Sequence, residues 1–230
     1  MEIYRCQDQI IQFLDDTVHQ IADEIDCGPA LVAAFEKDED GNPTSNRTKG
    51  VHLSSIIRYI MGRENPAYRK EETTLDEIGK RNSRFAMGMA WEHLLSWAIS
   101  QVFPNESRVI IGELEQDGII MTPDNVGLNE ALYQVDNLIV EEWKCTWKSS
   151  KHVTTDEAFA ENFKHWIWQL ASYCRALGTN DGLIRVFFVM DSYKFDSVCK
   201  PYCWRIKFSD DDLDSIWEMI LANGRDMGFL

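Results

Sequence analysis

Residues 138–146 have the sequence LIVEEWKCT, a short apolar run that carries three charged side chains. Its length and its content of branched and aromatic residues predict a buried β-strand. Because side chains alternate between the two faces of a strand, Glu142 and Lys144 point to one face and Glu141 and Trp143 to the other. Charged groups are costly to bury without partners. The strand therefore marks a candidate functional site.

The segments around this strand predict the rest of an α/β fold. A long helix and a hairpin with the turn Gln116-Asp117-Gly118 precede it, and a second helix, closed by Gly178, follows it. A last helix begins with a capping box formed by Ser209 and Asp212. The predicted helices are 84–103, 156–177 and the one opened by Ser209, and the predicted strands are 109–111, 119–121, 138–146, 183–190 and 202–208. This order predicts one mixed sheet with helices on its faces.

The first 50 residues differ from the remainder in pattern. Apolar residues recur every three or four positions within residues 7–26, which predicts a helix, whereas residues 36–50 contain no apolar side chain and predict an acidic loop. Ser54 or Ser55 then caps a short helix that runs through Ile60. We therefore expect a helical extension with an acidic loop over residues 1–50 and a compact domain over residues 51–230.

The charge of the chain is unevenly distributed. The 230 residues carry 23 Lys and Arg against 38 Asp and Glu, a net charge of -15, and 44% are hydrophobic, which excludes wholesale disorder. Acids concentrate in residues 7–40 and 209–226, and basic side chains in residues 43–70 and 144–152. The acidic ends are interpreted as solvated helix faces, while the basic middle could dock a polyanion. No run is long and apolar enough for a membrane span, so we expect a cytoplasmic protein without membrane contact, in a bacterial or phage-infected cell.

The six cysteines predict reduced thiols. Cys199 and Cys203 are spaced one residue too far apart for a CxxC motif, and no second pair completes a zinc site. The alternative is an iron–sulfur cluster that joins Cys6 or Cys27 to this C-terminal pair, which is disfavoured because the fold would have to bring four ligands together.

Two more acids stand out because of where they fall. Asp124 follows the predicted strand at residues 119–123, and Glu92 interrupts the apolar face of the predicted helix at 84–103. Each has an ordinary explanation: Asp124 as a turn residue, Glu92 as a solvated position at the edge of the helix, and Glu142 with Lys144 as an ion pair. Their combination favours a shared site.

Several motifs in this chain resemble those of one enzyme family. Thr122-Pro123-Asp124 and, 18 positions after Asp124, Glu142-Trp143-Lys144 resemble the PD-(D/E)xK nuclease motif. Residues 88–92 (GMAWE) are similar to the GxxxE helix motif of lambda exonuclease-like and YqaJ-like members. Residues 169–173 match the QxxxY signature of the RecB-like branch, and residues 52–55 (HLSS) resemble its serine-rich element. The resemblance implies a restriction-endonuclease-like αβββαβ core with a central mixed sheet flanked by helices.

The resemblance also implies roles for these residues. Glu92, Asp124 and Glu142, with the backbone carbonyl of Trp143, would hold one or two Mg²⁺ or Mn²⁺ ions, and an all-oxygen donor set suits such hard cations. Lys144 would orient the attacking water or stabilise the charged phosphate. The resemblance further suggests that Gln169 positions Lys144 or DNA and that Tyr173 contacts backbone phosphate. The expected DNA-binding residues are Ser54, Ser55, Arg58, Trp147, Lys148 and Lys151.

The sequence thus predicts a metal-dependent DNA nuclease. We expect an exonuclease that acts on linear DNA in recombination, repair or phage DNA processing, with a recombination partner protein and oligomer formation both open. His52, His152 and His165 lack ligand-like spacing and are interpreted as surface residues. The alternative is a non-catalytic acidic protein that mimics DNA and inhibits a DNA-binding enzyme.

Overall fold

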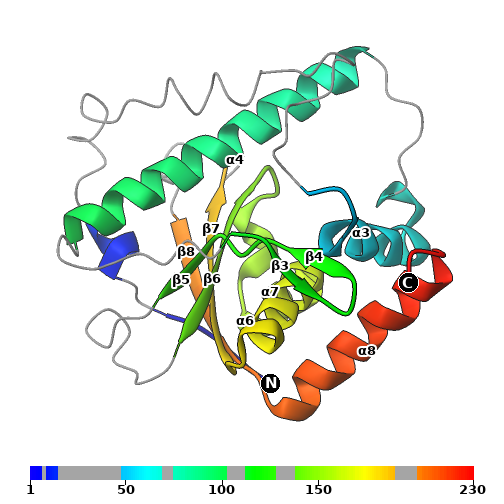
Figure 1. The fold of residues 1–230 in the computed structure, drawn as a ribbon. Helices are drawn as coiled ribbons and strands as arrows, with labels where there is room; N and C mark the ends of the chain where they lie inside the picture. The colour runs from blue at the N-terminus through cyan, green and yellow to red at the C-terminus, as the bar shows by residue number, and fades with distance from the viewer. Residues whose placement is uncertain (7–8, 15–47, 69–74, 103–111, 128–137, 190–200) are drawn as a thin grey trace.

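A computed structural model describes residues 1–6, 9–14, 48–68, 75–102, 112–127, 138–189 and 201–230 (Figure 1). Within these ranges the chain forms a mixed α/β structure with a central sheet between helices, as the sequence predicted. None of the described helices combines the length and the apolar character that a membrane crossing requires.

The central sheet has five strands in the order β1-β8-β7-β6-β5. The strands are β1 Glu2–Arg5, β5 Asn125–Gly127, β6 Ile139–Thr146, β7 Asp181–Phe188 and β8 Pro201–Lys207. β6 and β7 run parallel, and the other neighbours pair antiparallel. The prediction of a helical extension over residues 1–50 missed β1, although residues 9–14 are helical. An exposed strand of four residues at a sheet edge leaves little periodicity to detect.

A second, small sheet corrects the expectation of a single one. It consists of β2 Val51–His52, β4 Ile119–Met121 and β3 Leu114–Gln116. Asp117 and Gly118 both have positive φ, 51° and 77°, which confirms the predicted hairpin turn. The strand predicted at residues 109–111 lies outside the described residues. Pro123, which has no backbone N–H to donate, lies between β4 of the small sheet and β5 of the central sheet.

Helices cover both faces of the central sheet (Figure 1). They are α3 Leu53–Glu64, α4 Leu75–Val102, α6 Asp156–Asn162, α7 Lys164–Leu177 and α8 Asp210–Asp226, with short 3₁₀ turns η1 Pro66–Tyr68 and η2 Ser150–Val153. On one face, Val140 and Ile184 share a core with Leu170 of α7 and with side chains of α3 and α8. On the other face, Trp143 packs in a cluster with Trp91 and Leu95 of α4.

The helix termini agree with the sequence in part. Gly178 is left-handed at the end of α7, and Ser209 with Asp212 forms the predicted capping box of α8. The helix predicted over 156–177 is in fact two helices, because the backbone of Phe163 (φ -126°, ψ 26°) leaves the helical region. The expected Ser54 or Ser55 cap is also wrong: His52 precedes the helix, without a side-chain cap, and both serines lie in its first turn.

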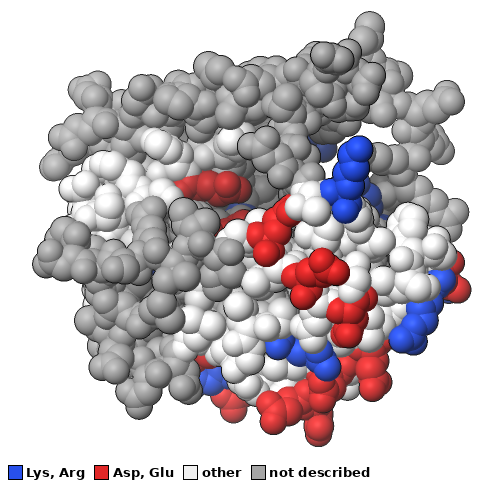
Figure 2. Space-filling model, in the orientation of Figure 1, with Lys and Arg blue, Asp and Glu red and all other residues white. Residues whose placement is uncertain are grey.

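Acidic side chains gather at the beginning of α8. Asp210, Asp211 and Asp212 occupy its first turn, where the positive end of the helix dipole favours them. Figure 2 shows Asp and Glu crowded over the part of this face where α8 begins. This accords with the interpretation of residues 209–226 as a solvated helix face.

Candidate functional site

The candidate site is centred on strand β6. Glu142 is fully buried and Lys144 is 18% exposed, and the ammonium group of Lys144 forms an ion pair with Oε1 of Glu142. Both side chains lie on the face of β6 that carries Val140 in the α7 core, as strand alternation predicted. The predicted shared face is therefore observed.

Asp124 is held against the same strand. It comes directly before β5, whose first residue, Asn125, pairs with Glu141 in the antiparallel ladder. The carboxylate Oδ2 of Asp124 accepts a hydrogen bond from the backbone N–H of Trp143 at 2.6 Å. Asp124 is therefore a neighbour of Glu142.

The carboxylates affect one another's protonation. Burial raises the pKa of Glu142 to about 8; the charges of Asp124 and Glu92 add to this rise, and Lys144 opposes it. Around Glu92, on α4, partial desolvation and then the charge of Asp124 raise the pKa to about 7. The Glu92 side chain is also open to solvent, which screens its interactions. The structure thus brings Glu92, Asp124, Glu142 and Lys144 within electrostatic range of one another.

The same acids also raise the pKa of Lys144, whereas burial has the opposite effect on it. Burial alone would lower the pKa of its ammonium group, but Glu142, then Asp124 and Glu92, outweigh that effect and raise it. Lys144 is therefore a firmly protonated cation enclosed by acids, and it can donate hydrogen bonds to an anion without first gaining a proton.

One oxygen of this cluster bears on metal binding. Oε2 of Glu142 is buried and has no hydrogen-bond partner among the described residues, and a buried carboxylate oxygen left without a partner is destabilising. A hard cation would satisfy it, and carboxylate oxygens are the donors that Mg²⁺ and Mn²⁺ prefer. Across the described ranges, no three His, Cys, Asp or Glu side chains are arranged to hold one ion as they stand. Lys144 engages the other oxygen of Glu142, so Glu142 could offer only Oε2.

The raised pKa of Glu142 predicts how stability changes with pH. Its ordinary value is 4.5 and its folded value about 8, so between these values the folded chain binds more protons than the unfolded chain. Without divalent cations, the free energy of unfolding should therefore fall as the pH rises from about 4.5 to 8. Urea unfolding in a chelating buffer measures this. A Glu142→Gln variant should show a flatter profile, and equally steep profiles would contradict the assignment.

The reverse face of β6 carries a different charged pair. Glu141 and Arg185 of β7 are both fully buried, and Nη1 of Arg185 forms an ion pair with Oε2 of Glu141. The same oxygen accepts a hydrogen bond from Nε1 of Trp143 at 2.9 Å. Glu141 therefore packs on the face of the sheet that α4 covers and is not one of the acids of the candidate site. The sequence analysis did not single out Arg185, although strand alternation places it on the same face as Leu183.

Gln169 and Tyr173 share a face of α7, as their spacing predicted. Nε2 of Gln169 donates a hydrogen bond to the hydroxyl of Tyr173 at 2.7 Å. Gln169 is half-buried, and Tyr173 is only 3% exposed. The structure thus shows Tyr173 as a partner of Gln169, while their predicted contacts with Lys144 and DNA stay predictions.

The residues expected to bind DNA form two groups. Ser54, Ser55 and Arg58 lie on α3, where Ser55 and Arg58 are exposed. The second group follows β6 directly: Trp147 is 41% exposed, and Lys148 and Lys151 are exposed as well. The second group therefore continues from the strand that carries Glu142 and Lys144.

His165 is a residue that the sequence analysis placed wrongly. It is half-buried on α7 rather than at the surface, one helical turn before Gln169 and two before Tyr173. Burial, and then the charges of Lys148, Lys144 and Lys164, lower its pKa to about 4. The spacing of 165, 169 and 173 is the signal that could have revealed it, because residues four apart share a helix face.

Four of the cysteines can be compared with the prediction of reduced thiols. Cys6, Cys145, Cys174 and Cys203 form no disulfide within the described ranges, and the backbone N–H of Cys6 donates to the carbonyl of Cys203. Cys27 and Cys199 lie outside the described residues.

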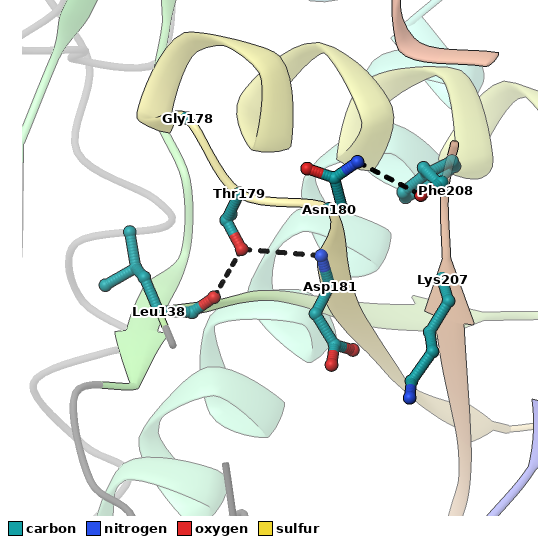
Figure 3. A pocket seen from close by; sticks show the side chains of 7 residues that line it. All are labelled: Leu138, Gly178, Thr179, Asn180, Asp181, Lys207 and Phe208. Atoms are coloured by element: carbon teal, nitrogen blue, oxygen red, sulfur yellow. Dashed lines mark hydrogen bonds between the residues drawn. The ribbon is translucent and has the colours of Figure 1, made fainter. Parts of the chain in front are cut away.

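A separate cavity of about 420 Å³ opens at the other end of the sheet (Figure 3). It is lined by Leu138, Gly178, Thr179, Asn180, Asp181, Lys207 and Phe208. Thr179 donates to the Leu138 carbonyl and accepts from the backbone of Asp181, and Asp181 is paired with Arg205. Since these polar groups satisfy one another and Lys144 lies about 20 Å farther along β6, the cavity is not part of the candidate site.

Comparisons with known proteins give structural likeness only. No family model matches the chain, and no curated protein sequence matches it. Its structure is similar to the crystal structure of SSO0001 (TM-score 0.50, 14% identity, 86% of this chain and 84% of that one). It is also similar to LHK-Exo in complex with dAMP (0.47, 14%, 78% and 88%) and to a phage-related exonuclease from Haemophilus somnus 129PT (0.40, 13%, 87% and 92%). The likeness to SSO0001 shows a shared fold.

Proposed function

We propose that this chain is a metal-dependent deoxyribonuclease that hydrolyses phosphodiester bonds, more specifically an exonuclease acting on linear DNA. The observation that carries the proposal is the buried pair of Glu142 and Lys144 with Asp124 beside it. The ammonium group of Lys144 engages only one of the two carboxylate oxygens of Glu142. Here Oε2 of Glu142 is left over.

Under this proposal the ion is held by Glu92, Asp124, Glu142 and the carbonyl of Trp143. The bound cation would make a water molecule more acidic and take up negative charge on the scissile phosphate. Lys144 donates hydrogen bonds to the attacking water or to the phosphate oxygens, from a position fixed by Glu142. The hydrogen bond from Trp143 fixes the orientation of Asp124.

The surroundings of the site support a nucleic-acid substrate. Lys148 and Lys151 extend the positive charge beyond Lys144, and Trp147 exposes an aromatic face between them and β6. Cations and an aromatic ring beside a hydrolytic centre are suited to a phosphate backbone and its bases. The biological setting we propose is DNA recombination, repair or phage DNA processing.

The test is the degradation of end-labelled linear duplex DNA by the purified chain. With Mg²⁺ or Mn²⁺ the linear DNA should be shortened progressively to nucleotides, whereas a covalently closed circle of the same sequence should stay intact. A chelator should stop the reaction. Cleavage of the circle would contradict exonuclease action, and absence of hydrolysis with both cations would refute the nuclease.

The DNA-mimic alternative makes the opposite use of the acids. It requires carboxylates on an exposed face, such as those at the beginning of α8, but it leaves the fully buried Glu142 and the acids that act on it without a role. It also predicts stoichiometric inhibition of a DNA-binding enzyme without any hydrolysis. We therefore favour the nuclease.

A further inference from the structure

A cluster of one lysine and two aromatic side chains adjoins the candidate site on the side away from Glu92's helix. Three elements contribute to it: η1 supplies Tyr68, the segment after β6 supplies Lys148, and α7 supplies His165. Nζ of Lys148 lies 3.5 Å from the hydroxyl of Tyr68, and the rings of Tyr68 and His165 are 6.5 Å apart. Lys144 and Lys148 both act electrostatically on His165, so the cluster lies next to the catalytic lysine.

Three lysines act electrostatically on His165, and of these Lys148 is available to a ligand. Lys144 is paired with Glu142, and Lys164 is paired with Glu64 at 2.5 Å. Lys148 has no carboxylate partner among the described residues. With the part of the chain that the structure describes, its ammonium group makes long contacts, 3.5 Å to the Tyr68 hydroxyl and 3.5 Å to the carbonyl of Asn162, and it lies 4.8 Å from the centroid of the Phe163 ring.

His165 adds a neutral hydrogen-bonding group to this cation. Its lowered pKa means that the ring is uncharged near neutral pH, with one nitrogen donating and the other accepting. Nδ1 is buried and has no hydrogen-bond partner in the described part of the chain. The ring is oriented by packing, with Trp166 at 5.3 Å and Phe163 at 6.3 Å. A structural histidine would be expected to have a partner for its buried nitrogen.

We propose that Lys148, His165 and Tyr68 form a binding subsite for a backbone phosphate of the substrate strand, one that neighbours the scissile phosphate. This inference rests on the proposed nuclease function and specifies where its substrate is held. Lys148 supplies the charge, while His165 and the Tyr68 hydroxyl supply directed hydrogen bonds. Trp147, next to Lys148 and 41% exposed, offers a ring on which the adjoining base stacks.

The subsite combines a charged contact from Lys148 with a neutral contact from His165, and the two respond differently to salt. Neutralising one phosphate with a lysine releases counterions and contributes about 0.9 to the slope of log affinity against log salt on duplex DNA. A neutral imidazole contributes affinity but no counterion release. Lys148→Met should therefore lower the salt slope by about 0.9, whereas His165→Leu should weaken binding roughly three- to tenfold with the slope unchanged.

The experiment measures fluorescence anisotropy of a labelled linear duplex with the full chain in a chelating buffer, over a series of salt concentrations. His165→Gln keeps a donor and should recover most of the affinity that His165→Leu loses. Matched controls are Lys207→Met on β8 and His152→Leu on η2, both exposed side chains outside the cluster, which should bind as the unaltered chain does. With Mg²⁺ present, the Lys148 and His165 variants should raise KM more than they lower kcat.

The outcomes separate this inference from the function on which it rests. If the unaltered chain cleaves linear DNA but Lys148→Met leaves the salt slope unchanged, or His165→Leu binds as tightly as the His152→Leu control, the subsite is refuted and the nuclease stands. A chain that neither binds nor cleaves DNA refutes both. A reduced slope in Lys148→Met, together with rescue by His165→Gln, supports the subsite.

Discussion

Replacing Lys144 with Met should lower kcat for hydrolysis of linear DNA by roughly 10²- to 10³-fold, the usual loss when a directed donor to a charged transition state is removed. Met preserves most of the aliphatic stem, and Glu142, whose pKa is about 8, can take up a proton when its cation is removed, so the variant is expected to fold. The ammonium group of Lys144 is held by Glu142 and faces the acids of the site, and no other described cation forms an ion pair with Glu142. Arg should not substitute, because its wide planar fork differs from a compact ammonium.

A matched control for this change is Lys207→Met, the same substitution at an exposed lysine near the other end of the sheet. It should keep full activity. Circular dichroism should show both variants folded, and binding of duplex DNA in a chelating buffer should persist in Lys144→Met. Activity of Lys144→Met within tenfold of the control would remove Lys144 from the chemistry.

The sequence predicted the composition of the site better than its surroundings. Glu142 and Lys144 could be placed on one face because alternation along a strand is a local rule. Asp124 could be assigned to the same site because it follows the predicted hairpin strand by only a few residues. The ion pair of Arg185 with Glu141 depends instead on the parallel register of β6 and β7, in which Glu141 pairs with Leu183 and Trp143 with Arg185. Spacing along the chain does not encode that register.

Two local failures have a similar origin. The helix predicted over residues 156–177 breaks at Phe163, but the apolar pattern continues through the break, since Phe159, Phe163 and Ile167 are all buried. The spacing of apolar residues therefore gave no sign that the helix ends at Phe163. His165 follows directly after the break, and its closeness to Lys148 depends on how α7 is set against the end of β6. The sequence does not give the angle between α7 and β6, so from the sequence alone His165 could not be distinguished from a surface histidine.

The largest expected effect on stability comes from the buried pair behind the site. Replacing Arg185 with Met should lower the free energy of unfolding by about 3–5 kcal/mol, because Glu141 is left as an unpaired charge in the interior. Both side chains are fully buried, so solvent does not relieve this cost. Urea unfolding gives the value from the midpoint and slope.

The double variant Glu141→Gln with Arg185→Met isolates the cause of that loss. Gln removes the charge but still offers an oxygen to Nε1 of Trp143, so the double variant should regain much of the stability that Arg185→Met loses. Arg175→Met serves as the control, because Arg175 pairs with the exposed Asp214 and such surface pairs contribute about 1 kcal/mol or less. If Arg185→Met lost no more than Arg175→Met, the pair would not stabilise the sheet. If the double variant fell below Arg185→Met, the loss would arise from packing around Trp143 rather than from the unpaired charge of Glu141.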